Sequence, residues 1–383
     1  MTIAPVGNTP AATAAVTSAI PLDIASRPMS RPVADLTVSV LNGGTSFPPI
    51  PIPASGFMRA IELIVTFNGT VTSAGALSPG DGPFNLISNL SLSDATGTPL
   101  IQPISGYSLY LLNKYFGVGA GFDSWFSSNP MESPDYAYSA TATTLTASYI
   151  LRLELEQDSH GYMAIPNLDS NASPQLRIDA AQWSAAFAGT GATSASLNVK
   201  VNQLYYAPVG ATTGGVPNQT TPPGYGDYMQ TRFENFPVIA GSENVIPLSS
   251  KGGLIKGVVL VSRNAGVRTD YAPGTKFGYV YDNNEYHAGG TIEAWRDRLR
   301  RAYGYTGADI TTSHAPVSAG VRTGLDRGVV ALPFFREGPR RHSWLPTRVG
   351  TLLQVKVTPG AGAAGMDVIT QLGQVRDGGA FYA

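Results

Sequence analysis

Short apolar runs that alternate with polar residues recur along this chain. Between positions 151 and 156 three leucines alternate with one arginine and two glutamates, and 36–40 and 197–202 repeat the arrangement. A period of two is typical of a strand with one buried face. Turn-favouring sequences separate such runs, namely 42–44, 78–81 and 96–97. The pattern predicts many short strands, as in a β-sandwich or jelly roll.

The composition excludes the main alternatives to an all-β fold. Glycine and proline contribute 43 and 29 of the 383 residues, which argues against long helices and coiled coils. Hydrophobic residues still make up 43%, so the chain can form a core and is not intrinsically disordered. Charged residues are only 13%, against roughly 25% in a typical soluble domain. This low charge indicates a surface that partners cover, and we expect an all-β protein with a few short helices.

A charge-free stretch divides the chain. Residues 208–224 contain no charged side chain, as expected of a linker or crossing loop. Before it the chain has 7 basic and 13 acidic residues, a balance of −6, and from 208 onward it has 18 and 13, a balance of +5. We therefore predict a low-complexity N-terminal arm at 1–30, a first jelly roll at 31–207, a linker at 208–226 and a second jelly roll at 227–383. The arm is expected to order only against something else.

The two halves resemble each other. Residues 56–65 and 253–262 each have a glycine, two apolar residues, a base, a small residue and then an apolar run, at an offset of 197. Residues 92–94 match 280–282 at an offset of 188. A helical i, i+4, i+8 pattern follows in each half, at the same offset of 188, formed by Tyr107, Leu111 and Tyr115 and by Trp295, Leu299 and Tyr303. The repetition predicts two tandem eight-stranded jelly rolls, a double jelly-roll β-sandwich.

No secretory or membrane segment is expected. Residues 1–20 place no basic residue before an apolar core, unlike a signal peptide. The best apolar runs, 60–67 and 254–261, fall well short of the roughly 18–20 residues of a membrane span.

The residues that carry catalysis and metal binding are sparse. Cysteine is absent, which excludes disulfides and thiolate sites. The histidines lie far apart in the sequence, at His160, His287, His314 and His342, and none has metal-ligand spacing. Residues 360–365 match G-x-G-x-x-G, but the chain has no room for the helix, strand and acid that a dinucleotide site needs. We interpret them as a flexible hairpin loop, and we predict no catalytic residue, no cofactor and no metal ion.

Two groups of charged residues could form either a functional site or a solvated surface. Glu154 and Glu156 lie on one strand face about 7 Å apart, a spacing that suits a glycosidase pair, and Asp158 follows them. Because a leucine row forms the opposite face, we interpret the acids as a solvated strand face. The basic cluster of Arg296, Arg298, Arg300 and Arg301 lacks interleaved aromatic residues for base stacking, so we assign it to an interface or a solvated face.

Three segments resemble a known family. Residues 82–97, followed by 104–114, look like the first roll of tectivirus-type major capsid proteins, and 295–301 resembles the arginine-rich helix of their second roll. The resemblance extends to the layout from about residue 30 to the end. It implies a double jelly-roll subunit of the tectivirus and adenovirus-like lineage, as in a bacteriophage with an internal membrane. In such a virus, homotrimers with a pseudo-hexagonal outline tile an icosahedral shell over the membrane.

The expected function is therefore that of a structural major capsid protein in the virion, assembled in the host cytoplasm, and not an enzyme. Expected partners are further copies of the chain, minor capsid or vertex proteins, and the internal membrane through the arm. Direct nucleic-acid binding is not expected, since the arm has no polybasic run. The opposite charges of the halves suggest that the first roll of one copy meets the second roll of the next. Two alternatives are a trimeric phage tail, spike or receptor-binding protein, and a secreted carbohydrate-binding tandem β-sandwich.

Overall fold

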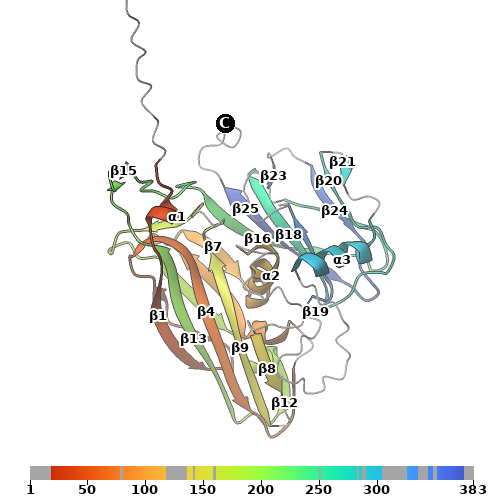
Figure 1. Cartoon of the computed structure of the whole chain (residues 1–383). Helices are drawn as coiled ribbons and strands as arrows, with labels where there is room; N and C mark the ends of the chain where they lie inside the picture. Colours follow the sequence, from red (N-terminus) through yellow and green to blue (C-terminus); the bar gives the residue numbers. More distant parts are fainter. Residues whose placement is uncertain are drawn as a thin grey trace, which may run out of the picture.

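The computed structural model shows two β-rich units with helix α2 (Gly106–Phe116) between them (Figure 1). The structure describes residues 19–77, 81–117, 136–140, 143–157, 161–249, 252–282, 284–286, 290–303, 326–334, 344–347 and 352–374. The other helices are α1 (Leu22–Ala25), α3 (Ile292–Tyr303) and the short 3-10 turns η1 (Gly82–Leu86) and η2 (Trp183–Ala185).

The first unit is a sandwich of two antiparallel sheets. Its strands are β1 (Pro28–Ser39), β2 (Thr45–Ser46), β3 (Ile50–Pro51), β4 (Gly56–Thr70), β5 (Ser73–Leu77), β6 (Ile87–Ser93), β7 (Pro99–Ile104), β8 (Tyr136–Ala140), β9 (Thr144–Glu154), β10 (Ile165–Asn167), β11 (Gln175–Ala180), β12 (Phe187–Thr190) and β13 (Ser194–Tyr206). One sheet has the order β1-β13-β4-β9-β8, with β10 paired to β4. The other has the order β2-β11-β6-β7, with β3 also paired to β11, and β5 and β12 form a separate pair.

The second unit repeats this design. Its strands are β16 (Tyr228–Pro237), β17 (Asn244–Pro247), β18 (Leu254–Asn264), β19 (Val267–Arg268), β20 (Gly278–Tyr281), β21 (Asn284–Tyr286), β22 (Val329–Pro333), β23 (Leu345–Pro346), β24 (Leu353–Val357) and β25 (Gly365–Gln374). One sheet is β16-β25-β18-β19, with β22 and β23 also paired to β18, and the other is β17-β24-β20-β21.

Strand order identifies both units as jelly rolls. Each unit has eight main strands, and the chain distributes them between its two sheets in the same order. Strands β1-β13-β4-β9 of the first unit correspond to β16-β25-β18-β22 of the second, and β2-β11-β6-β7 correspond to β17-β24-β20-β21. The prediction of an all-β double jelly roll with a few short helices is confirmed. We call the two units the first roll and the second roll. Strand β13 ends at Tyr206 and β16 begins at Tyr228; the domain boundaries at 31, 208 and 227 stay predictions.

The internal repeat seen in the sequence corresponds to equivalent elements. The segments at an offset of 197 are the equivalent strands β4 and β18, and the segments at an offset of 188 end β6 and β20. The two helical patterns are α2 and α3, each placed between equivalent strands. A β-bulge also repeats, because the strand pairing skips Arg59 in β4 and Lys256 in β18, again 197 residues apart. The base shared by both segments is thus the bulged residue.

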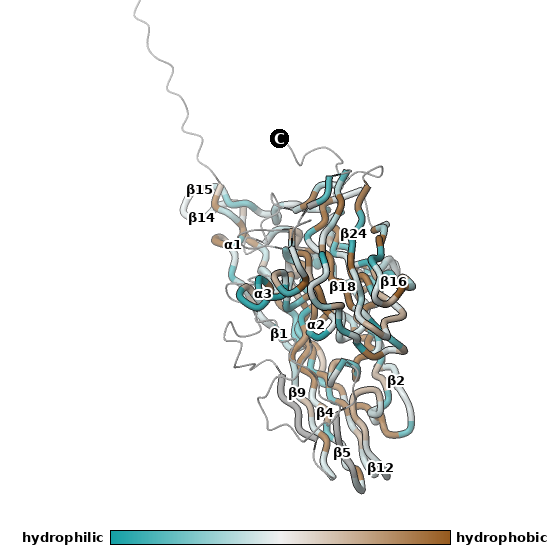
Figure 2. Tube along the Cα trace, turned by 90° about the vertical axis from the view of Figure 1, so that its right-hand side faces the viewer, coloured by the Kyte–Doolittle hydropathy of each residue, from teal (hydrophilic) through white to brown (hydrophobic). Residues whose placement is uncertain are grey.

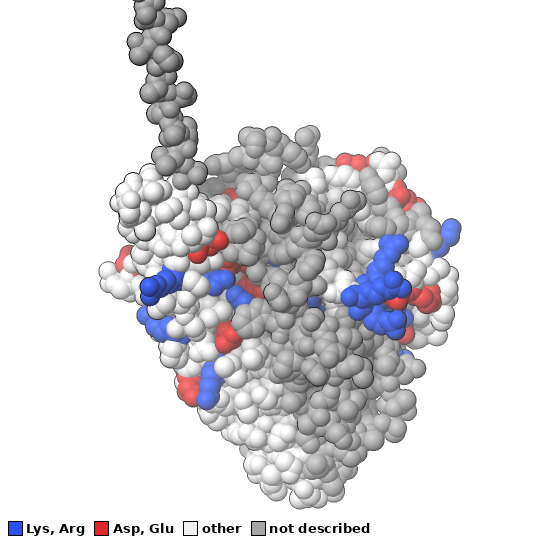
Figure 3. Space-filling model, in the orientation of Figure 1, with Lys and Arg blue, Asp and Glu red and all other residues white. Residues whose placement is uncertain are grey.

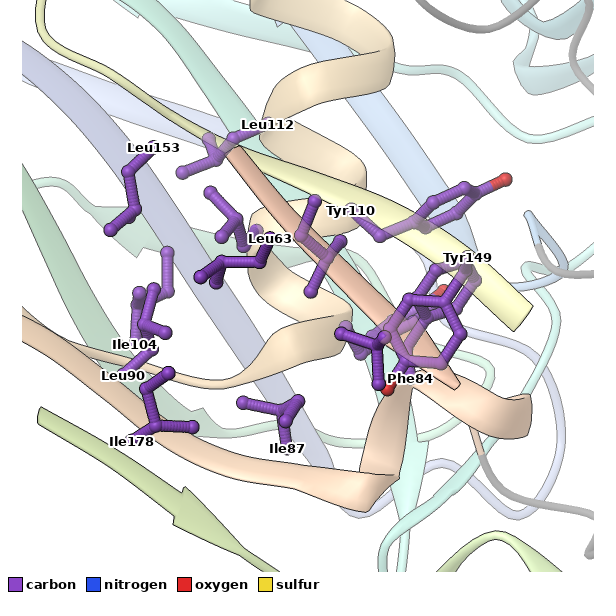
Figure 4. Close-up of a cluster of buried hydrophobic side chains, with 14 of the residues drawn as sticks. Leu63, Phe84, Ile87, Leu90, Ile104, Tyr110, Leu112, Tyr149, Leu153 and Ile178 are labelled. Atoms are coloured by element: carbon purple, nitrogen blue, oxygen red, sulfur yellow. The ribbon is translucent and has the colours of Figure 1, made fainter. Parts of the chain in front are cut away.

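Alternating residues fill the sandwich of the first roll. Leu63, Leu153 and Ile178 belong to strands of both sheets, and each is at most 1% exposed. Figure 4 shows these side chains pointing toward one another together with Leu90 and Ile104. The hydropathy colouring of Figure 2 shows the hydrophobic stretch of β18 inside the molecule. The period-two pattern therefore placed the core correctly.

Part of the predicted arm is ordered on its own chain. Leu22 in α1 is fully buried against Phe57, Ala164 and Tyr206, and β1 already begins at Pro28. The expectation that the whole arm orders only against a partner is therefore wrong for 19–30, and residues 1–18 lie outside the described part.

The charge-free stretch also forms structure. It contains the hairpin β14 (Thr212–Thr213) and β15 (Val216–Pro217), and Asn218 forms a parallel bridge with Ile20. Figures 1 and 2 both show this hairpin beside α1. The stretch thus ties the start of the described chain to the crossing between the rolls.

The glycine-rich segment 360–365 is not a hairpin loop. It connects β24 to β25, and these strands belong to different sheets of the second roll. The Gly360 N–H donates to the Asp270 carbonyl at 2.8 Å, and a Cβ at Gly360 would approach that oxygen to 2.5 Å. Glycine is needed there for a close backbone approach, not for binding phosphate.

Among the described helices, none is long and apolar enough to cross a membrane.

Candidate functional site

Helix α2 forms the centre of the junction between the two rolls. Its N-cap is Ser105, whose hydroxyl accepts the Ser108 N–H at 3.1 Å. The sequence pattern predicted one buried face, yet every residue of α2 is buried. The second face is covered because α2 contacts β9 and β6 of its own roll and also β18 and β22 of the second roll.

Strand β18 is buried on both faces. Val258 and Leu260 belong to the internal core of the second roll, whereas Val259 and Val261 belong to the core cluster that contains α2. A strand covered on both faces has a continuous apolar run instead of an alternating one. This explains why residues 258–261, which follow the bulge at Lys256, are all apolar.

A glycine allows α2 to approach this sheet closely. Gly257 in β18 faces Phe116 at the end of α2, and a Cβ built on Gly257 would overlap the Phe116 ring. Phe116 is fully buried. The two rolls are thus packed at interior density along this contact.

A buried ion pair crosses the junction. Lys114 Nζ of α2 lies 2.5 Å from an Asp326 carboxylate oxygen, and the Tyr115 hydroxyl donates to the other oxygen at 3.1 Å. The side chains of Lys114 and Asp326 are 4% and 0% exposed. Such a pair fixes orientation, since removal of either partner leaves an uncompensated buried charge.

A second charged cluster joins the rolls beside η1. Asp81 of the first roll receives two hydrogen bonds from Arg263, at 2.7 and 3.0 Å, and lies 3.0 Å from Arg268 Nε. Arg263 also contacts Asp367 at 2.5 Å. Burial is the largest single influence and lowers the pKa of Arg263, but the charge and hydrogen bonds of Asp81 together with the charge of Asp367 outweigh it, so the net shift is upward. Both guanidinium groups lie over the Tyr107 ring, whose hydroxyl has a pKa raised by burial.

The two equivalent bulge residues bind neighbouring side chains of the first roll. Arg59 pairs with Glu156 at 2.6 Å, and Lys256 of the second roll donates to Gln157 at 2.9 Å. Glu156 also accepts the Tyr206 hydroxyl at 2.9 Å. Two consecutive residues of the first roll, Glu156 and Gln157, therefore bind the β-bulge residues of both rolls.

These contacts correct the interpretation of the acidic pair. Strand β9 ends at Glu154, so alternation no longer governs Glu156, which turns inward and is fully buried. Glu154 is half-buried at the strand end. The predicted solvated face is wrong for Glu156, which is a structural ion-pair partner, and Asp158 lies outside the described residues.

A small cavity lies inside the junction. Its volume is ≈ 20 Å³, enough for a single water molecule, and Leu112, Arg152, Glu154, Met229 and Gln371 are among the residues that line it. Burial lowers the pKa of Arg152. A cavity of this size is a packing feature and offers no room for a substrate.

The arginines of α3 take two different positions. Arg296 forms an ion pair with Asp270. Arg300 and Arg301 both contact Asp297, at 3.3 and 2.8 Å, and remain 68% and 78% exposed. Figure 3 shows a basic patch on the surface in the region where Figure 1 places α3.

Helix α3 is attached through its apolar side. The Trp295 indole N–H donates to the Ala331 carbonyl at 2.8 Å, and Arg298 lies 5.6 Å from the Trp295 ring centroid. Leu299 is buried, and Tyr303 packs edge-on against Tyr115 of α2.

The four histidines, His160, His287, His314 and His342, lie outside the described residues. Within the described ranges, no group of three or more histidine, aspartate and glutamate side chains is arranged to hold a metal ion.

Sequence reasoning missed the charged residues of the junction. Lys114, Asp81 and Asp326 belong to no sequence motif, and their partners lie far along the chain. The one available signal was the base common to both repeats, at Arg59 and Lys256.

Comparisons with known proteins agree with this geometry. No protein-family model matches the chain, and no curated protein matches it. Solved structures, in contrast, match the chain over most of its length. The structure of Sulfolobus turreted icosahedral virus matches with 16% identity and a TM-score of 0.58, over 92% of this chain and 91% of that chain.

Two further structures match over similar lengths. The crystal structure of the STIV MCP has 12% identity and a TM-score of 0.56, over 92% of this chain and 97% of that one. PBCV-1 VP54, fitted into a reconstruction of the virophage Sputnik, has 10% identity and a TM-score of 0.56, over 92% and 96%. These are double jelly-roll major capsid proteins. The fold of this chain is the double jelly roll, as the resemblance in the sequence implies.

Proposed function

We propose that the protein is the structural major capsid protein of an icosahedral virus and forms a homotrimeric, pseudo-hexagonal building block. The observation that carries this proposal is the buried junction, which holds two equivalent rolls in one fixed relation. A chain whose rolls had independent functions would need no interior-like packing between them. The fold shared with viral major capsid proteins supports the same role.

The geometry of repeated rolls supports the trimer. A head-to-tail interface between different surfaces closes into a ring when its rotation fits. Three chains with two equivalent rolls each present six similar units around one axis. This gives a near-hexagonal outline, and such outlines tile a shell.

The surface charge supports a shell protein that does not bind nucleic acid directly. Only 13% of residues are charged, and interface cores are depleted of lysine, glutamate and aspartate. A chain that neutralised phosphates would need clustered basic residues. We infer that the protein is structural and not an enzyme, and that it resides in the virion after assembly in the host cytoplasm.

The same proposal includes partners beyond the trimer. These are neighbouring trimers, minor capsid or vertex proteins, and an internal membrane such as that of a bacteriophage. Residues 1–18, which contain no charged side chain, are the segment we assign to the membrane or to neighbouring subunits.

Native mass spectrometry of the purified full chain tests the proposal. Three copies of a 40.1 kDa chain give about 120 kDa, and we expect this species to dominate. A protein that stays monomeric at micromolar concentration would contradict the proposal and favour a tandem carbohydrate-binding protein.

A further inference from the structure

The dipeptide Asn–Gly occurs twice in the chain, at Asn42–Gly43 and at Asn68–Gly69. In this dipeptide the backbone nitrogen of glycine can attack the side-chain amide carbon of asparagine, because glycine has no Cβ to hinder the approach and its backbone adapts easily. The attack requires a local conformation that brings the two atoms together. The fold places the two dipeptides in opposite environments.

The first dipeptide lies at a bend in the loop between β1 and β2. Asn42 is partly exposed, Gly43 is exposed, and a Cβ built on Gly43 would meet no atom within 4 Å. Within the described part of the chain, no hydrogen bond holds the Asn42 side chain or the Gly43 N–H. The glycine nitrogen and the asparagine amide can therefore approach each other without breaking any contact of the fold.

The loop is anchored on both sides of this dipeptide. The Leu41 carbonyl accepts a hydrogen bond from the Gln182 side-chain amide at 3.2 Å. On the other side the backbone at Gly44 lies against residue 180, since a Cβ on Gly44 would approach the Ala180 carbonyl oxygen to 2.7 Å. A chemical change between these two anchors should therefore stay local.

The second dipeptide lies inside β4, between β13 and β9. Gly69 pairs with Ala195 on one side and with Leu145 on the other. The extended backbone of a strand keeps the asparagine side chain away from the next nitrogen, and pairing on both sides holds the backbone extended. The attack at Asn68 would need this part of the sheet to open first.

We propose that Asn42 is a site of spontaneous deamidation in the folded protein and that Asn68 is protected from it. The Gly43 nitrogen loses its proton to a solvent base and bonds to the Asn42 side-chain carbon, while the amide nitrogen takes up a proton and leaves as ammonia. Water opens the resulting cyclic succinimide at either carbonyl carbon, which leaves aspartate or isoaspartate. Water is the one co-reactant, and it reaches the exposed side of the loop.

The product adds a negative charge to a segment that has none. Residues 36–58 contain no charged side chain. A modification that changes charge acts through the contacts around it, and Asn42 has few. We therefore expect the modified chain to stay folded while its surface becomes more acidic with age. The inference needs only the fold of one chain and is independent of the proposed function.

Peptide mapping by mass spectrometry tests the proposal on the full-length protein, incubated at mildly alkaline pH to favour loss of the Gly43 proton. Trypsin cleaves after Arg59, so Asn42 and Asn68 fall in different peptides. In the folded protein we expect conversion at Asn42 to be faster than at Asn68 by about tenfold or more. In guanidinium chloride the two rates should become similar, because both dipeptides are then in an unfolded chain.

Two variants separate the chemistry from the fold. Gly43→Ala should slow conversion at Asn42 by about tenfold, because a Cβ hinders the attack, yet it should leave the melting temperature unchanged. Asn42→Asp has the charge of the product from the start and should also melt like the wild type.

Equal rates at Asn42 and Asn68 in the folded protein would overturn the proposal. A rate ratio that is the same in guanidinium chloride would also overturn it, since the difference would then come from the neighbouring sequence and not from the fold. A lower melting temperature for Asn42→Asp would show that the change does not stay local. None of these results bears on the capsid role, which the mass of the assembled species tests separately.

Discussion

Lys114 and Asp326 form an ion pair at 2.5 Å although 212 residues separate them in the sequence. Lys114 belongs to α2 of the first roll, and Asp326 precedes β22 of the second roll. Because both side chains are buried, the pair is formed only when the rolls are seated against each other. It therefore reports directly on the relation between the two units.

Removing one partner of this pair should lower the free energy of unfolding more than replacing both partners by uncharged residues. We expect Lys114→Met to lower the free energy of unfolding by about 3–5 kcal/mol, since Asp326 is left charged and buried. The double variant Lys114→Met/Asp326→Asn should lose less, because no lone charge remains. Urea denaturation measures both. Lys356→Met is the control, since it removes the solvent-screened pair with Glu285 and should leave the free energy of unfolding nearly unchanged. Equal costs for Lys114→Met and the control would contradict the assignment.

The close approach at Gly257 should tolerate no side chain. We expect Gly257→Ala to destabilise the protein by about 1–3 kcal/mol in thermal unfolding, because the new Cβ overlaps the buried ring of Phe116. Gly43→Ala is the control, since a Cβ there meets nothing within 4 Å. Adding Phe116→Leu should relieve part of the loss at Gly257, and an unchanged melting temperature for Gly257→Ala would show that the contact is loose.

The two acids near the end of β9, Glu154 and Glu156, should contribute unequally to the stability of the fold. Glu156→Gln removes the charge that binds Arg59 within the fold, and we expect a loss of about 3 kcal/mol or more in chemical denaturation. Glu154→Gln, its half-buried neighbour, should cost less. A solvated pair would give two small and similar effects, which is the result that would restore the original interpretation of this strand.

Tyr303 should add an alkaline instability. Burial raises its pKa to about 12, so the folded state holds the phenolic proton more tightly than the unfolded chain, whose tyrosine titrates near 10. Stability from this group is present below pH 10 and is lost as the pH rises from about 10 to about 12. Tyr303→Phe should therefore flatten the fall in unfolding free energy over that window. If wild type and variant decline in parallel, the phenol is not shielded.

The sequence predicted most of the fold because strand alternation and internal duplication are local or repeated signals. Leu151 and Leu153 point into the core of the first roll, and Arg152 between them lies on the other face of β9, as strand alternation requires. The repeat correctly identified β4 as the equivalent of β18 and α2 as the equivalent of α3. The resemblance to tectivirus-type capsid proteins named the same fold.

The junction could not be predicted in the same way. Lys114 pairs with a residue on the other roll, and nothing near either one in the sequence indicates the contact. The alternation pattern wrongly predicted a solvated position for Glu156. A period of two holds only while the chain stays extended, and β9 ends two residues before Glu156. Arg59 and Lys256 were noticed as shared bases, but only strand pairing shows that they are bulges.

Single-particle imaging of the purified full-length protein tests the central claim most directly, because it shows the arrangement of the rolls. The account predicts end-on views with three-fold symmetry and six similar lobes, in which the contact within a chain and the contact between chains are related by nearly the same rotation. Elongated particles, or trimers that touch through only one kind of roll, would contradict it.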